Sequence, residues 1–174
     1  NCNKGYYENI FGKISKAISS YELAWKIYNK NKLTTYDITE YCLKPLGNLY
    51  TLIGDYSNAE NSIKQYYFVA SQEKNEYQKQ AAVLNLSNVY QNTGRIDQAI
   101  ELLEKTIQKE KLTNAQKGLL YNNLGSNYFL NTRATKMKSY AFENAEKAFL
   151  KAVLLLEREP SQHEALTNSY RNLC

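Results

Sequence analysis

The residue types that most often carry catalysis are sparse in this chain of 174 residues. It has a single histidine, His163, which follows Pro160 near the start of the last helical segment expected from the sequence. Triads and zinc hydrolase motifs need a histidine at a fixed relation to other ligands or to a nucleophile, and no such arrangement can be assembled around His163. The glycines are isolated, so the sequence has no phosphate-binding glycine motif either. We therefore expect no enzymatic activity and no cofactor.

Metal binding, nucleic-acid binding and membrane insertion also lack support. Cys2, Cys42 and Cys174 are far apart and form no CxxC pair, which argues against a metal site or a disulfide framework. The formal net charge of +5 comes from scattered lysines, whereas nucleic-acid binding needs a concentrated basic face. The longest apolar-rich stretch, 148–156, is interrupted by Lys151 and is too short to span a bilayer. We expect a protein or peptide as the partner, and no membrane span.

A short phrase recurs along the chain and indicates how its elements are organised. Leu46-Gly47-x-x-Tyr50 is followed by Gly54 and Ala59, and related phrases begin at Leu86-Ser87 and Leu124-Gly125. Repetition at a period of a few tens of residues is typical of a solenoid of stacked units, which presents an extended binding surface rather than a closed pocket. The abundance of Glu, Lys, Gln, Leu and Ala favours helices throughout.

Each phrase has a physical meaning on a pair of antiparallel helices. Leu86 and Tyr90 lie four residues apart and therefore share one helical face, which we expect to point to the core. Gly94 follows the end of this helix, where a residue in the left-handed conformation terminates a helix at little cost. Small residues mark the places where the two helices of a pair come close, and Gly47 is expected to lie opposite Ala59.

These residues resemble the tetratricopeptide repeat (TPR), a helix-turn-helix unit of ~34 residues. The repeat has a Leu-Gly-x-x-Tyr phrase in its first helix and an Ala-x-x-x-Phe phrase in its second, and the resemblance covers roughly residues 40–157. It implies an all-α fold, in which antiparallel helix pairs stack into a right-handed superhelical solenoid. It also implies a role in protein interaction.

The resemblance predicts that residues 1–174 form a single TPR array. A degenerate repeat is expected at 5–38, where Asn9-Ile10-Phe11-Gly12 stands in place of the phrase. Full repeats are expected at 40–78, 80–113 and 118–160, and a further, truncated repeat begins at 161–174. Because Tyr170-Arg171-Asn172-Leu173-Cys174 repeats the phrase and then stops, we expect the chain to be a fragment of a longer protein.

Two irregularities interrupt the array. Eight extra residues near 132–139 form either a functional loop or an extension of two helices by about a turn each. Pro45 either occupies the first turn of a helix that begins near Tyr41 or kinks a helix that begins near Asp37.

In TPR proteins the first helix of each unit lines a concave groove, and the resemblance places the candidate binding residues there. The predicted peptide-binding groove contains Lys44, Asn48, Asn85, Asn88, Asn122 and Phe129. Lys44, Asn48 and Asn85 match positions of the carboxylate clamp that holds a peptide C-terminus in some TPR proteins. However, Leu119 and Asn123 stand where that clamp needs a lysine and an arginine, and TPR asparagines also form hydrogen bonds between repeats. A neutral groove of amides and aromatic rings suits an extended or helical peptide.

The function expected from these features is a protein-interaction or regulatory scaffold that binds a peptide or protein segment in the groove. Two alternatives remain open. The phrases around Leu46 and Leu124 resemble repeat regions that precede a caspase-like CHAT protease domain in bacterial proteins, and TPR arrays ahead of histidine kinases look similar. The chain would then be the sensory segment of a larger enzyme. In the other alternative, the insertion with Arg133, Lys136 and Lys138 binds nucleic acid.

Overall fold

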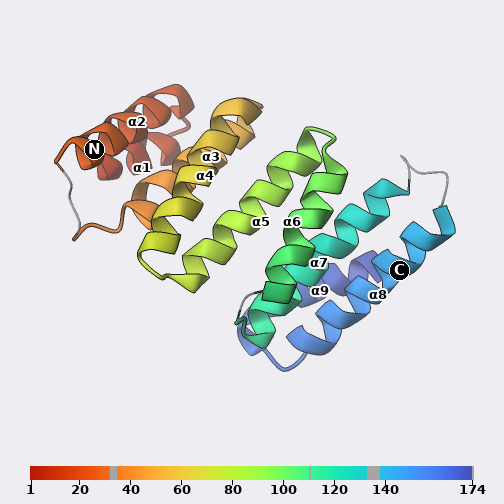
Figure 1. Ribbon diagram of the computed structural model, residues 1–174. Coiled ribbons are helices and arrows are strands. Elements are labelled where there is room, and N and C mark those ends of the chain that lie inside the picture. The colour runs from red at the N-terminus through yellow and green to blue at the C-terminus, as the bar shows by residue number, and fades with distance from the viewer. Residues whose placement is uncertain (32–34, 110, 133–137, 174) are drawn as a thin grey trace. The chain divides into compact units, whose positions relative to one another are not determined.

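The computed structural model describes residues 1–31, 35–109, 111–132 and 138–173, and these residues are almost entirely helical (Figure 1). The elements are α1 (Cys2–Ile10), α2 (Ile14–Asn31), a π-helical turn η1 (Thr39–Leu43), α3 (Lys44–Leu52), α4 (Tyr56–Gln72), α5 (Glu76–Asn92), α6 (Ile96–Lys109), α7 (Asn114–Asn131), α8 (Lys138–Leu156), a 3-10 turn η2 (Pro160–Gln162) and α9 (His163–Leu173). No strand occurs in these residues, so the predicted all-α fold is confirmed. Most of the insertion predicted near 132–139, including Arg133 and Lys136, lies outside the described residues.

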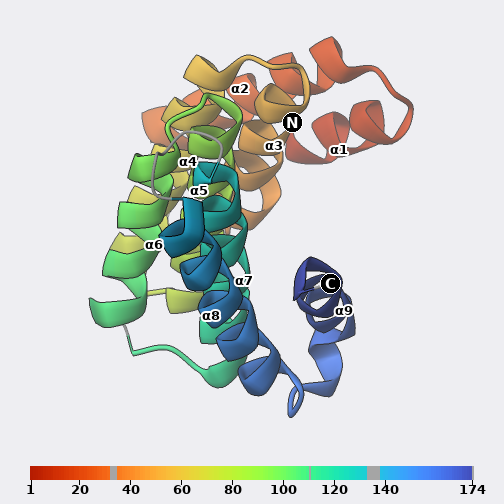
Figure 2. The same ribbon diagram turned by 90° about the vertical axis from the view of Figure 1, so that its right-hand side faces the viewer.

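The chain divides into two compact units, Asn1–Val89 and Tyr90–Cys174. In the first unit α1 packs on α2, α3 packs on α4, and η1 contacts all four of these helices. In the second unit α7 packs against both α6 and α8, and α9 lies against α8 and α7 (Figure 2). Successive helices therefore pack as neighbours within each unit.

Close contacts between helices occur where the first helix carries a glycine. A Cβ atom at Gly47 would lie 2.7 Å from Cγ1 of Ile63 on α4, and one at Gly125 would lie 2.7 Å from the ring of Phe149 on α8. Both partners are large and buried. Gly47 was expected to lie opposite Ala59. It lies instead against Ile63, one helical turn further along α4.

A contact of the same kind shows where the repeated phrase lies in the first helix pair. A Cβ atom at Gly5 would lie 3.0 Å from the ring of Tyr21 on α2, whereas Gly12 lies in a turn with φ +69° and nothing near its Cβ position. Phe11, expected to be the core leucine equivalent, is 71% exposed. The placement of the phrase at Asn9-Ile10-Phe11-Gly12 was thus wrong by seven residues, because the glycine that ends the helix was taken for the glycine that packs.

The ends of α1, α3, α4 and α5 share one turn geometry. After α3, the amide of Gly54 donates to the carbonyl of Thr51 at 3.2 Å and the amide of Asp55 donates to that of Tyr50 at 2.9 Å. Gly54 has φ +77° and Gly94 has φ +74°, so the predicted left-handed helix end at Gly94 is confirmed. After α4 the same position is occupied by Lys74, at φ +55°.

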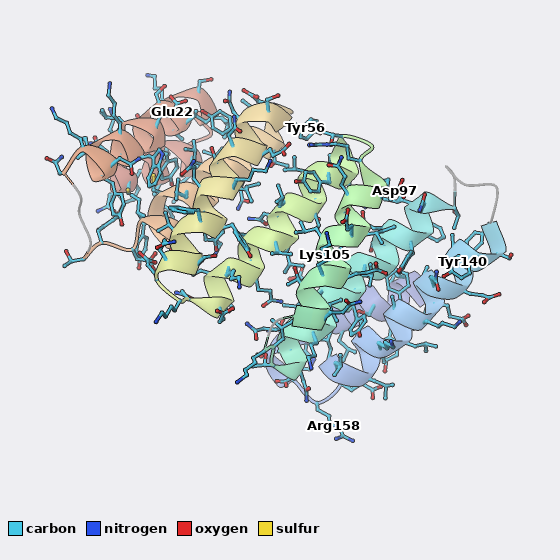
Figure 3. The ribbon with its side chains drawn as sticks, in the orientation of Figure 1. Glu22, Tyr56, Asp97, Lys105, Tyr140 and Arg158 are labelled. Carbon is cyan, nitrogen blue, oxygen red and sulfur yellow. The ribbon has the colours of Figure 1, made fainter. Side chains whose placement is uncertain are left out.

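The tyrosine of the phrase links one helix pair to the preceding helix. The hydroxyl of Tyr50 on α3 donates to the carboxylate of Glu22 on α2, which Figure 3 labels, and that of Tyr128 on α7 donates to Glu104 on α6. Burial, together with the neighbouring carboxylate, raises the pKa of both tyrosines. Both phenols therefore remain protonated donors at neutral pH.

Pro45 is accommodated by the π-helical turn. The helical segment begins before Tyr41, and the amide of Lys44 donates to the carbonyl of Thr39, five residues earlier. Pro45 then falls in the first turn of α3, where its missing N–H costs little. The wide turn thus absorbs the proline that would otherwise clash within a continuous α-helix.

The glycine contact predicts the effect of substituting Gly47. Gly47→Ala should lower the free energy of unfolding by about 1–3 kcal/mol, because its Cβ overlaps Ile63. Chemical denaturation of Gly47→Ala, Ile63→Ala and the double variant measures this. Since the two groups touch, Ile63→Ala should cost less in the Gly47→Ala background than in the wild type. Strictly additive losses would contradict the contact.

The left-handed residue after α4 predicts a stabilising substitution. Lys74→Gly should raise the free energy of unfolding by about 0.5–1 kcal/mol, because glycine relieves the cost of a positive φ and only part of the gain is lost to unfolded-state entropy. Gly94→Ala, at the same turn position, should have the opposite effect. Denaturation curves of both variants give the comparison, and a destabilised Lys74→Gly protein would be inconsistent with this turn.

Candidate functional site

A groove of about 620 Å³ lies between α1, η1 and α3 in the first unit. Three of its lining tyrosines are more than half exposed: Tyr6 and Tyr7 on α1, and Tyr41 on η1. Tyr6 and Tyr7 meet edge to face with ring centroids 5.4 Å apart. The buried ring of Tyr21, on α2, also lines the groove. We call this surface the α1–α3 groove and define it by Tyr6, Tyr7, Tyr41, Lys44 and Asn48, with the other lining residues Cys2, Asn3, Asn9, Tyr21, Glu40 and Pro45.

The charges in the groove cancel. Nζ of Lys44 donates to both carboxylate oxygens of Glu40, at 2.9 and 3.0 Å. Nε2 of Gln78, on α5, donates to the same carboxylate at 2.6 Å, and Gln78 in turn accepts a hydrogen bond from the hydroxyl of Tyr66. Partial burial opposes ionisation of Glu40, but the hydrogen bonds from Gln78 and Lys44 outweigh it and hold its pKa below the usual range. The lysine is thus already paired with a carboxylate of its own chain.

Four of the six residues predicted to form the groove lie in the first unit. Lys44 and Asn48 line the α1–α3 groove. Nδ2 of Asn85 donates to Oδ1 of Asn48 at 3.1 Å, which is a hydrogen bond between successive helix pairs. Asn88 is exposed one turn further along α5. Lys44, Asn48 and Asn85 are therefore brought close together, while their polar groups already bond to the chain itself.

The remaining two predicted residues lie in the second unit. Oδ1 of Asn122 on α7 accepts a hydrogen bond from Oγ of Ser169 at 3.0 Å, and Ser169 is buried on α9. Phe129 is 45% exposed and packs edge to face on Phe142, with ring centroids 5.8 Å apart. Neither residue lines the cavity of about 250 Å³ that α6, α7 and α8 form in this unit.

Sequence reasoning missed the aromatic wall contributed by α1. Tyr6 and Tyr7 directly follow Gly5, the packing glycine of the first helix pair. Aligning this pair on Gly5 rather than on Gly12 would have identified α1 as the equivalent of α3, and its tyrosines as groove residues. The contact between Gln78 and Glu40 has no such signal, because the two residues are remote in sequence.

The described residues also bear on metal binding and membrane insertion. No cluster of three or more His, Cys, Asp or Glu side chains suited to a metal ion is found among them. None of the helices in the same part of the chain combines the length and the apolar character needed to cross a bilayer.

Comparison with known proteins identifies a repeat and a fold. Residues 80–108 match the tetratricopeptide repeat family. No curated protein matches the chain. A crystal structure of kinesin light chain nearly identical TPR-like repeats from Podosopora anserina superimposes with a TM-score of 0.68 at 17% identity, covering 99% of this chain and 81% of that one. A single-substitution variant of that protein gives a TM-score of 0.70 with the same identity and coverage.

The chain thus has the fold of TPR-like repeat proteins, and the identity to these structures supports nothing beyond the fold. The resemblance to repeat regions of CHAT-domain proteins stays a prediction, as do the boundaries of the individual repeats.

The polar network predicts a stability effect that depends on pH. Glu40→Gln should lower the free energy of unfolding at pH 7 by about 1 kcal/mol, a value reduced because the Glu40 side chain is about a third exposed. The folded-state pKa of Glu40 is depressed, so its contribution is present above the ordinary carboxyl pKa of about 4 and is lost as the pH falls through the lower folded-state value.

Thermal unfolding of the wild type and Glu40→Gln at pH 7 and near pH 3 tests this. The difference in melting temperature should be largest at pH 7 and shrink in acid. Glu101→Gln is the matched control, because the side chains of Glu101 and Lys105 are 62% and 60% exposed and loss of their ion pair should have little effect. An equal difference for Glu40→Gln at both pH values would argue against the network.

Proposed function

We propose that this chain is a protein-interaction module that binds an uncharged, extended peptide segment in the α1–α3 groove. One observation carries the proposal: three largely exposed tyrosines surround a groove of about 620 Å³ whose single lysine is neutralised by Glu40. Exposed aromatic rings offer large, rigid contact area to apolar side chains and prolines, and their hydroxyls reach peptide backbone groups.

The fold supports this proposal. The match of residues 80–108 to the tetratricopeptide repeat and the likeness to TPR-like repeat structures support it, because repeat solenoids expose extended surfaces that suit partner binding. The lining also has the composition of interaction sites, because it combines aromatic rings with amides such as Asn3, Asn9 and Asn48.

The electrostatics favour a neutral ligand over a free carboxylate. A carboxylate clamp requires cations that are free to bind the ligand. Here the Lys44 ammonium already bonds to Glu40, so a second carboxylate would meet a repelling neighbour as well as an occupied donor. We therefore place the binding determinants on Tyr6, Tyr41 and Asn48, with Asn88 extending the surface along α5.

A selected peptide tests the groove. A random-peptide phage library is panned on the protein, and the enriched peptide is synthesised with a fluorophore for anisotropy titration. Tyr6→Ala combined with Tyr41→Ala should weaken its affinity at least about tenfold, because exposed tyrosines of this kind carry much of the binding energy at interfaces. Tyr77→Ala and Tyr140→Ala are matched controls, since these tyrosines are 65% and 60% exposed outside the groove and should leave the affinity unchanged.

Circular dichroism must show that the double variant keeps its helicity. Unchanged affinity in a folded Tyr6→Ala, Tyr41→Ala protein would refute the groove assignment. A second comparison tests whether the groove binds a peptide carboxylate. The selected peptide should bind equally well with a free and with an amidated C-terminus. A strong preference for the free carboxylate would favour the clamp instead.

A further inference from the structure

Two cysteines that are remote in the sequence meet in the first unit. Cys2 is the first residue of α1 and Cys42 lies in η1, and these two elements pack against each other. Both cysteines lie beside Tyr21: the thiol of Cys42 donates to its carbonyl, and Cys2 lines the same groove as its ring. Burial, and next to it the nearby Cys2 thiol, raises the pKa of Cys42. Both cysteines are buried and lie outside any disulfide of the described residues. Their distance along the chain argued against pairing, but the fold brings them together.

The two thiols differ in access. Cys42 is fully buried, and its thiol donates to the carbonyl of Tyr21 at 3.2 Å. Cys2 is 8% exposed and lies at the meeting point of two openings, the α1–α3 groove and a cavity of about 300 Å³ lined also by Tyr36 and Ile38. A small molecule therefore approaches the pair from the side of Cys2.

The fold places the two cysteines in one neighbourhood, as a disulfide requires. Such a bond requires that the two Cβ atoms come within about 4.5 Å, and cysteines whose backbones are held apart cannot form one. Here α1 packs on η1, and Cys2 lines the same pockets as Ile38, Glu40 and Tyr41 next to Cys42. The bond would also enclose the whole of α1 and α2 in a covalent loop, because these helices lie between the two cysteines.

We propose that Cys2 and Cys42 form a disulfide that fastens α1 to η1 when the protein encounters a low-molecular-weight disulfide. The Cys2 thiolate attacks one sulfur of that molecule, whose S–S bond breaks, and the departing thiolate takes up a proton. The Cys42 thiolate then attacks the Cys2 sulfur and displaces the second thiol. Two electrons pass from the protein thiols to the small disulfide, which ends as two thiols.

Burial sets the rate of this exchange. It raises the pKa of the Cys42 thiol, so the second step requires transient opening of α1. The same burial shields the completed bond from reductants. The reaction is therefore slow in both directions, which suits a structural bond rather than a rapidly cycling one. Formation of this disulfide does not depend on peptide binding.

Peptide mapping of the oxidised protein tests the pairing. The purified wild-type chain is incubated with oxidised glutathione, remaining thiols are alkylated, and the digest is analysed without reduction by mass spectrometry. The expected product is a Cys2–Cys42 linked peptide, with Cys174 outside the linkage. Its formation should raise the melting temperature by about 5 °C relative to the reduced protein, because the loop no longer gains its full entropy on unfolding.

Variants establish which thiols are responsible. Cys174→Ser should retain both the linked peptide and the shift in melting temperature. Cys2→Ala and Cys42→Ala should each lose the shift, and the mass-spectrometric result on the wild type holds even where Cys42→Ala folds poorly. A linkage through Cys174, a glutathione adduct on Cys2 that never resolves, or a linked protein with an unchanged melting temperature would each overturn the proposal.

Discussion

The close approach of two helices at a glycine is the constraint on which the rest of this structure depends. At Gly5, Gly47 and Gly125, the absence of a side chain lets the first helix of a pair lie directly against a large residue of the second. Helices that pack without such a gap stay farther apart, at distances set by the side chains between them. The glycine therefore fixes the spacing of each pair, and the opposite face of the first helix becomes available to a ligand or a neighbouring element.

Much of this arrangement was predictable, because the packing glycine, the core leucine and the helix-ending glycine recur with nearly constant spacing. The exception is the first pair, where both positions are glycine: Gly5 packs against the second helix, and Gly12 ends the first helix. Gly47 and Gly54 are also seven residues apart, so this spacing indicates that Gly5 corresponds to the packing glycine Gly47 and Gly12 to the helix-ending glycine Gly54. What the sequence could not supply is the sign of φ, which distinguishes a glycine in a helix from one in a turn.

The candidate site was predictable in part. The contacts that could not be predicted join residues remote in the sequence. Lys44 and Asn48 follow from the position of their helix, and the Lys44–Glu40 pair follows from a four-residue separation. The buried Gln78 that completes the network comes from another helix pair, and no periodicity connects it to Glu40. The proximity of Cys2 to Cys42 is likewise a product of packing, since α1 must first be placed against η1.

The π-helical turn at η1 makes the first unit sensitive to the length of the chain. Each residue added to or removed from a helix rotates everything beyond it by about 100°. With its five-residue hydrogen bond from Lys44 to Thr39, η1 holds one residue more per turn than an α-helix would. A substitution of the exposed Tyr41 would therefore leave the backbone path intact, whereas loss of one residue from η1 would change how Tyr41 and the buried Cys42 are oriented relative to α1.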